Sequence, residues 1–451
     1  MLAATNRFDL ARIAQFPALY GTLVGLIALI VLLLCVGKVP LAYNVRNLIV
    51  RWRTSLMMVI AFILVVGLMT MMMAFVNGMI ALTANSGQPG NVVVFSGGAN
   101  DEGFSNLALT EVTNVERTEG IAVNAEGQRL ASKEVYVIAN QDVPVGPGQK
   151  PRRAFVQVRG LEDPLITSTV HNLRLKPGGL WFSAAGVEEA TSPDVPGGAY
   201  VQAVVGNGIA GELGMSSPEK RPLVVGETFF MADRLWKIVG ILDSTGSTYD
   251  SEVWAKRQIV AERFGKDVYS SFVVRATEID QAEKLAETLK DSKEVALTAM
   301  TEEQYFVNLQ ATSRVLLYAV LLVAVIMAVG GIFGVMNTMF AAISQRIKDI
   351  GVLRILGYAR GHVLISFLLE SMILALVGGI AGCFVGMLVD GWTAKSTVGS
   401  GPGAAKLVVL QFVVSQEVLA GGLVLALVMG LIGGLLPALR AMRMRVLETL
   451  R

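Results

Sequence analysis

The chain has 451 residues, of which 53% are apolar and only 16% are charged, and its mean hydropathy is +0.56. Because soluble domains carry about 25% charged residues, this composition excludes a wholly soluble globule, and the apolar content excludes a disordered chain. Two cysteines exclude a disulfide scaffold, and two histidines argue against a histidine-based metal site. The composition therefore predicts a membrane protein built of two or three units.

Charge divides the chain into two regions. Residues 77–313 hold 30 acidic and 21 basic side chains, whereas the rest of the chain holds 6 acidic and 17 basic ones. Lys and Arg gather on the cytoplasmic side of membrane proteins. We therefore expect the basic segments 38–53, 341–363 and the C-terminus to lie on the cytoplasmic side of a membrane. Residues 77–313 and the 390–417 loop are then expected outside.

The first hydrophobic segment, Pro17–Val36, has about the 20 residues that are needed to span the hydrocarbon core. It can be interpreted as a retained helix or as a cleaved signal peptide. Cleavage would leave the basic segment outside, against the charge rule, and no small-x-small site follows the apolar run. We therefore favour an extra transmembrane helix within residues 1–37.

Two segments of different character follow. Residues 38–54 are basic and amphipathic, as suits a helix that lies along the inner membrane surface. Residues 55–76 are apolar on every side and predict the second transmembrane helix.

The external region, residues 77–313, alternates β-branched runs with Gly- and Pro-rich turns, which is typical of a mixed α/β domain. Strands are expected at Asn91–Phe95, Val135–Ile138, Ala154–Val158, Tyr200–Val205, Phe229–Met231, Trp236–Ile241 and Ser271–Arg275. Helices are expected at Asn207–Leu213, 252–264 and Ile279–Lys290, and from Thr301 into the next hydrophobic segment.

No catalytic pattern stands out in this external region. His171 has no His or Cys near it in the sequence and is expected at the surface. Adjacent side chains on a helix point apart, so the pairs Glu188–Glu189 and Glu302–Glu303 are expected on solvated faces. We expect a non-catalytic chain with no metal and no cofactor of its own.

Residues 314–451 contain three more hydrophobic segments, Val315–Phe340, Leu364–Val389 and Val418–Pro437. Gly382 and Gly386 have the spacing that lets helix backbones approach closely, either inside the bundle or at a homodimer seam. Glu370 is an ionisable residue well inside a span. It could pair with a neighbouring helix or a basic loop residue, or it could couple subunits.

The 341–363 loop is amphipathic. Apolar residues recur at helical spacing among basic and acidic residues, at Ile343, Ile347, Ile350, Leu353 and Leu356. Gly357 is expected to end the helix. Such a helix either lies on lipid headgroups or docks on a cytoplasmic partner.

No Gly-x-x-x-x-Gly-Lys-Ser/Thr loop occurs in the sequence. The nearest string, Gly399–Lys406 (GSGPGAAK), lacks Gly before the Lys and Ser or Thr after it. Energy for any active work is therefore expected from another chain or from an ion gradient. The nearly uncharged spans argue against an ion-coupled carrier.

Several positions match a known pattern of a span, a charged loop and a second span. They are Asn337, Arg346, Asp349, Ile350, Gly351, Arg354, Gly357, Tyr358 and Glu370. Through them Gly331–Gly391 resembles the FtsX-like domain of ABC transporter permeases of the MacB/LolC/LolE type. Asp349 stands where Glu is usual and Tyr358 where Ala is usual. Tyr200–Val239 and the ending Gly434–Arg451 resemble the same family less specifically.

The resemblance implies an α-helical membrane protein with about five transmembrane helices. A mixed α/β extracytoplasmic domain, like the MacB periplasmic core, is then inserted between the second and third. Residues 314–451 would be the FtsX-like permease domain. The implied ATPase-coupling helix contains Arg346, Lys348, Asp349, Ile350, Gly351, Arg354 and Gly357. Packing or coupling within the membrane is implied for Asn337, Glu370, Gly382 and Gly386.

By the same resemblance, the chain is expected to have no fused ATPase domain. It would act as a homo- or heterodimer with a separate cytoplasmic ABC ATPase, which binds ATP and Mg²⁺. The implied mechanism is mechanotransmission, for export or extraction of a lipid, lipoprotein, peptide or drug-like substrate. A periplasmic adaptor or outer-membrane partner and membrane lipids are further expected partners, and nucleic acid is not. The alternative is an FtsX-like signalling subunit that controls a periplasmic hydrolase or adaptor.

Overall fold

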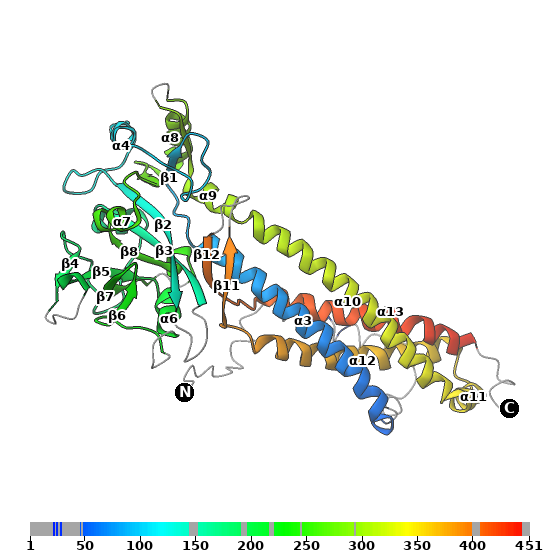
Figure 1. Cartoon of the computed structure of the whole chain (residues 1–451). Coiled ribbons are helices and arrows are strands. Elements are labelled where there is room, and N and C mark those ends of the chain that lie inside the picture. The colour runs from blue at the N-terminus through cyan, green and yellow to red at the C-terminus, as the bar shows by residue number, and fades with distance from the viewer. Residues whose placement is uncertain are drawn as a thin grey trace. The chain divides into compact units, whose positions relative to one another are not determined.

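The computed structural model describes residues 21–22, 24–25, 28, 46 and 48–443, except for 144–151, 191–195, 216–220, 244–245, 293–294 and 399–405 (Figure 1). The chain divides into two compact units. The helical unit comprises Met1–Asn77, Leu316–Trp392 and Phe412–Arg451, and the external unit comprises Gly78–Val315 and Thr393–Gln411.

The helical unit is built from long apolar helices. They are α3 (Trp52–Ala84), α10 (Ala311–Ser344), α12 (Arg360–Met387) and α13 (Gln416–Arg443), with the short α11 (Ile347–Ile355) before α12. Within the described residues, four helices are long and apolar enough to span a membrane, and α9 and α10 together count as one of them. They contain the four hydrophobic segments that the sequence predicts from residue 55 onward. The segment Pro17–Val36 lies largely outside the described residues.

Small residues allow close packing in this unit. A Cβ atom built at Gly382 on α12 would lie 2.8 Å from Cβ of Val66 on α3, and one at Gly386 would lie 2.5 Å from Cβ of Thr70. Both distances are too short for a side chain, so glycine is required for α12 to lie against α3. Gly382 and Gly386 therefore lie at a helix contact within the bundle, and their use at a homodimer seam stays a prediction.

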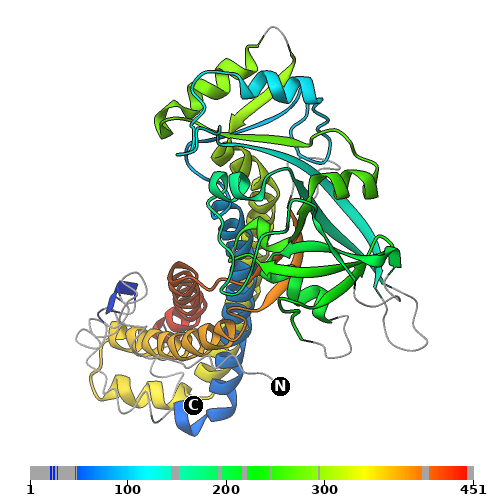
Figure 2. The ribbon, with the colours of Figure 1, turned by 90° about the vertical axis from the view of Figure 1, so that its left-hand side faces the viewer.

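The external unit contains a ten-stranded mixed sheet in the order β10-β1-β9-β2-β3-β8-β5-β7-β6, with β4 paired to β5 (Figure 2). The strands are β1 (Asn91–Ser96), β2 (Ala131–Val143), β3 (Arg152–Leu161), β4 (Val187–Glu189), β5 (Ala199–Val205), β6 (Thr228–Met231), β7 (Arg234–Ile241), β8 (Glu252–Lys256), β9 (Ser271–Arg275) and β10 (Leu297–Thr301). All seven expected strands are present, and the mixed α/β class is confirmed.

Helices pack on both faces of this sheet. Successive residues of a strand point to opposite faces, and β1 accordingly sends Val92 and Val94 into one core and Val93 and Phe95 into another. The first core includes side chains of α4 (Leu109–Glu116), α6 (Asn207–Met215), α7 (Arg257–Phe264) and α8 (Ala282–Lys290). The second includes side chains of α5 (Pro164–Val170) and α9 (Glu302–Leu309).

Two sequence expectations need correction here. The segment 252–264 is not one helix, because its first five residues form β8, which pairs in parallel with β3, and only the rest forms α7. The 390–417 segment is more than a loop. Its residues Thr393–Val398 (β11) and Lys406–Gln411 (β12) form an antiparallel hairpin that belongs to the external unit.

Candidate functional site

The elbow between α10 and α12, residues 345–359, contains the short helix that the sequence predicts. Arg346 is the N-cap residue of α11, and Leu356 is its C-cap residue. Gly357 then has a φ of 92°, a left-handed conformation that glycine adopts without steric cost. The chain therefore leaves α11 at Gly357 and enters α12 three residues later.

A buried ion pair ties this elbow to α12. Nη1 of Arg346 donates to Oε2 of Glu370 at 2.7 Å, and Nη2 donates to Oε1 at 2.9 Å. Both side chains are buried, and the guanidinium also lies over the ring of Phe367. Two parallel hydrogen bonds fix the orientation of both partners, so the start of α11 is held rigidly against α12.

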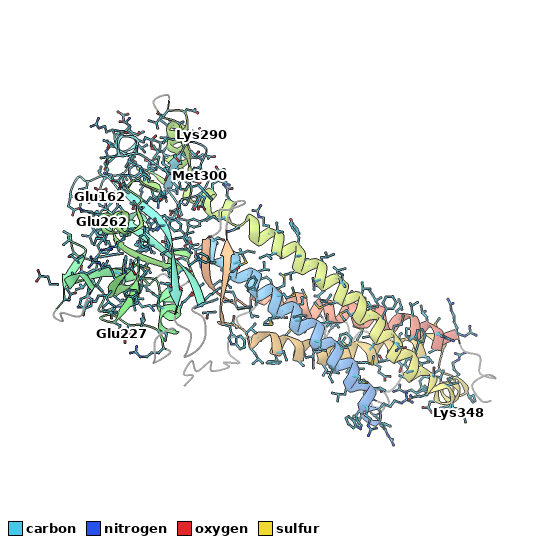
Figure 3. The ribbon with its side chains drawn as sticks, in the orientation of Figure 1. Glu162, Glu227, Glu262, Lys290, Met300 and Lys348 are labelled. Carbon is cyan, nitrogen blue, oxygen red and sulfur yellow. The ribbon has the colours of Figure 1, made fainter. Side chains whose placement is uncertain are left out.

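The outer surface of α11 combines charge with exposed apolar side chains. Lys348, labelled in Figure 3, and Asp349 are exposed. Val352, Ile355 and Leu356 expose 50%, 60% and 70% of their surface. Exposed large apolar side chains in a cluster indicate an interaction surface.

In the external unit, a second set of buried charges surrounds Arg159 of β3. Its Nε donates to Glu252 at 2.6 Å, and its Nη1 donates to Glu102 at 2.8 Å and also to Glu134. The rings of Tyr136, Tyr249 and Trp254 lie against the same guanidinium. We call this set, together with His171 and Glu302, the buried charge cluster.

His171 extends the buried charge cluster toward α9. Its Nε2 lies 2.7 Å from Oε1 of Glu134, and its Nδ1 lies 3.0 Å from Oε1 of Glu302. The hydroxyl of Tyr249 donates to the same Glu302 oxygen at 3.0 Å. One imidazole therefore joins a carboxylate of β2 to a carboxylate at the start of α9.

The carboxylates determine the charge of this imidazole. Burial by itself would lower the pKa of His171, but Glu134 and Glu302 raise it to about 10. Burial would likewise raise the pKa of Glu134, but Arg159 and His171 lower it to about 2. His171 is therefore an imidazolium at neutral pH and donates from both ring nitrogens.

Glu302 joins three parts of the external unit. Its Oε2 accepts from the backbone N–H of Gln88 at 3.0 Å and from Nδ2 of Asn91 at 2.8 Å. Gln88 and Asn91 lie where the chain passes from α3 to β1, and Glu302 lies where it passes through α9 to α10. One buried carboxylate thus holds both chain connections that lead to the long helices.

The β11–β12 hairpin provides a third such connection, because it lies between α12 and α13 in the chain. The backbone N–H of Val409 donates to Oγ of Ser251 at 2.8 Å, and Lys395 pairs with Glu212 of α6. A Cβ atom at Gly78 would lie 2.1 Å from the carbonyl oxygen of Gln411. The hairpin therefore packs closely against the rest of the external unit, and a side chain at position 78 would not fit.

Two family models match most of the described chain. The MacB-like periplasmic core domain matches residues 55–292, and the FtsX-like permease C-terminal domain matches residues 321–446. The chain belongs to the MacB-like, FtsX-like permease family.

Individual relatives agree with this assignment. The permease is 29% identical over 301 residues to the macrolide export ATP-binding/permease protein MacB of Nitrobacter winogradskyi, covering 62% of this chain and 42% of that protein. It is 28% identical over 236 residues to the uncharacterized ABC transporter permease YknZ of Bacillus subtilis, covering 50% of this chain and 57% of that protein. The chain thus spans about half the length of these relatives.

One solved structure is also similar in part. It is the crystal structure of the periplasmic region of MacB from Actinobacillus actinomycetemcomitans. The matched region covers 50% of the permease and 95% of the crystallised chain. The sequence identity is 16% and the TM-score is 0.32.

The permease brings only some of the predicted residues together. Arg346 and Glu370 form the ion pair described above, and Nη1 of Arg354 donates to the carbonyl of Tyr358 at 3.0 Å. Ile350 and Gly351 are buried in the elbow. Asn337 is exposed on α10. The coupling role of these residues stays a prediction.

Two predictions in the external unit are wrong. His171 is buried, not at the surface, and Glu302 is buried while its neighbour Glu303 is exposed. The partners of His171 lie far away in sequence, so no local pattern reveals them. One signal was available, since Arg159 stands inside the apolar strand VQVRGL, where a charge requires a buried partner.

Within the part of the chain that the structure describes, no group of three or more His, Cys, Asp and Glu side chains could hold a metal ion. The carboxylates of the buried charge cluster are instead engaged by Arg159 and His171.

Proposed function

We propose that this permease is the membrane subunit of an ABC transporter in the bacterial cytoplasmic membrane. A separate ATPase binds ATP and Mg²⁺, and the permease transmits the motion of hydrolysis to its external domain. The transported molecule would be a lipid, lipoprotein, peptide or drug-like compound. Its relatives support this proposal, because one of them is a macrolide export ATP-binding/permease protein.

The observation that carries the proposal is the construction of the α11 elbow. Ile355 and Leu356 present an apolar surface that a cytoplasmic ATPase can cover. The Arg346–Glu370 pair then resists rotation of α11 against α12, because separating two buried charges is costly. A force applied to α11 therefore moves α12 instead of only bending the elbow.

The external unit is suited to receive such motion. α9 is followed after Gln310 by α10, and Glu302 anchors the start of α9 to Gln88, Asn91 and His171. A displacement along α10 would reach the buried charge cluster through this one carboxylate.

The proposal is tested by the double variant Ile355→Asp/Leu356→Asp. The permease and its ATPase, identified by co-purification from native membranes in mild detergent, are reconstituted together, and ATP hydrolysis is measured with and without the permease. We expect the variant to insert normally but to bind its ATPase about a hundredfold more weakly, since the two apolar side chains would each contribute roughly 1.4 kcal/mol or more on burial in the interface. Single replacements of Asp349, Gly351 and Arg354 by Ala form a second set, in which stimulation of ATP hydrolysis should fall.

The matched control is Leu180→Asp in the external unit, which makes the same chemical change at a residue that is 72% exposed. It should leave ATPase binding unchanged. Full ATPase binding and stimulation by the Ile355/Leu356 variant would contradict the proposal. A stoichiometric periplasmic hydrolase in the same purification would instead favour the signalling function.

A further inference from the structure

The external unit contains a pocket that the proposed transport mechanism does not use. Its volume is about 600 Å³, within the roughly 300–1,000 Å³ of small-molecule sites. The walls come from the loop after β1, from β2 and from the end of α7. The residues that line it include Asp101, Phe104, Tyr136, Ile138, Phe264 and Lys266.

Apolar side chains line the mouth of this pocket. Phe104 is 58% exposed, and Ile138 is exposed as well. Phe155 of β3, also exposed, pairs with Asn140, two residues beyond Ile138 on β2. Residues two apart on a strand share a face, so Ile138 and Phe155 lie on the same face of the hairpin. Phe104 and Ile138 line the pocket together, and Phe155 extends the apolar face of the hairpin beyond Ile138.

The pocket also contains one accessible positive charge. Gly265, with a φ of 65°, ends α7 and turns the chain so that Nζ of Lys266 donates to the carbonyl of Tyr136 at 3.3 Å. Lys266 is half-buried. Burial lowers its pKa, against the opposing effects of Glu102 and Asp101. An ammonium in this position gains from a ligand that supplies a negative charge.

Two acidic residues lie near Lys266, and one of them, Asp101, also lines the pocket. Asp101 and Glu102 are buried, Oδ1 of Asp101 accepts from the backbone N–H of Gly103 at 2.8 Å, and Glu102 pairs with Arg159. Because Asp101 is only 4% exposed and Lys266 is half-buried, Lys266 is the more accessible of the two charges that line the pocket.

We propose that this pocket binds a small amphiphile with an anionic head group. The head group pairs with Lys266, and the apolar body lies on Phe104 and Ile138. This goes beyond the proposed function, because binding requires neither the ATPase nor movement of the membrane helices. A failed test of ATPase coupling would thus leave this site standing, and the reverse also holds.

The test measures protection of Lys266 from acetylation in the full chain, reconstituted in lipid nanodiscs. Sulfo-N-hydroxysuccinimide acetate modifies exposed amines, and peptide mass spectrometry reports the rate at each lysine. Sodium decanoate is the probe. We expect it to slow acetylation of Lys266 at least fivefold, because it covers the amine and favours its protonated form. The exposed Lys284 of α8 should be modified at an unchanged rate.

Three comparisons decide the outcome. Decyltrimethylammonium, with the same chain and opposite charge, should give no protection, and neither should acetate, which has the charge without the chain. Phe104→Ala should raise the decanoate concentration for half-protection about tenfold, whereas Phe230→Ala, at an exposed Phe of β6, should not. Equal rates with and without decanoate, equal protection by the cation, or an unchanged Phe104→Ala variant would each overturn the proposal.

Discussion

The contribution of Arg346 and Glu370 to stability depends on both charges being present. Removing one partner leaves the other charge buried, which costs roughly 3–5 kcal/mol, whereas replacing both by apolar residues can be nearly neutral. We therefore expect Arg346→Met and Glu370→Met to lower the thermal stability of the helical unit, and the double variant to recover most of it.

The double variant also separates stability from coupling. It should still stimulate its ATPase poorly, because apolar contact does not fix the orientation of α11 as two parallel hydrogen bonds do. Thermal unfolding in detergent and ATP hydrolysis, measured on the same preparations, check both parts. Full stimulation by the double variant would show that the pair serves stability alone.

Because of His171, the stability of the external unit should depend on pH in the neutral to alkaline range. Its pKa is raised from 6.5 to about 10 in the folded unit, so folding takes up a proton between these values. The stabilisation is fully present below pH 6.5 and is lost as the pH rises toward 10. Glu134, with its pKa lowered from 4.5 to about 2, acts in the opposite direction, and its contribution is lost as the pH falls below 4.5.

We expect the unfolding midpoint of the external unit to fall steadily between pH 7 and 10. Tryptophan fluorescence of the full chain can follow it, since Trp254 lies beside His171. His171→Gln should be less stable at pH 7 and should lose most of this slope, whereas His362→Gln in α12 should keep it. A His171→Gln variant with the wild-type slope would disprove the assignment.

At the scale of elements, Gly382 of α12 and two glycines of α10 differ in the space around them. Gly382 lies against Val66 with no room for a side chain, whereas a Cβ atom at Gly330 or Gly334 of α10 meets nothing within 4 Å. We expect Gly382→Leu to lower the yield of folded protein sharply, through overpacking that costs roughly 1–3 kcal/mol or more. Gly334→Leu should leave the fold intact. Size-exclusion profiles and thermal unfolding compare the two, and equal damage by both would refute the distinction.

Elements with regular patterns were predictable from the sequence, and those held by distant charges were not. The runs NVVVF and SFVVR predicted β1 and β9 because both strands are buried on both faces, which suits an unbroken run of β-branched and aromatic residues. The strand β8 was missed because Glu252 and Lys256 resemble the polar positions of a helix. Only the fold reveals that Glu252 is buried against Arg159. The same reason explains why His171 and Glu302 were misplaced.

At the scale of the whole molecule, the orientation in the membrane can be tested directly. Single cysteines replace Lys290, Glu227 or Lys348 in a chain whose own Cys35 and Cys383 are changed to serine. We expect a membrane-impermeant maleimide to label positions 290 and 227 in intact spheroplasts and position 348 only after permeabilisation. A cysteine near the N-terminus decides between an outside tail and the opposite orientation. Labelling of position 348 in intact cells would reverse the proposed topology.

The β11–β12 hairpin has a consequence for how the protein is made. Translation proceeds from the N-terminus, and domains generally fold in that order. Of the two parts of the external unit, residues 78–315 leave the ribosome before the hairpin does. The hairpin, which contacts Ser251 and Glu212, follows only after α10 and α12 have been synthesised. At the usual elongation rate this delay is on the order of ten seconds. The external unit can therefore reach its final form only after α10 and α12 have been synthesised.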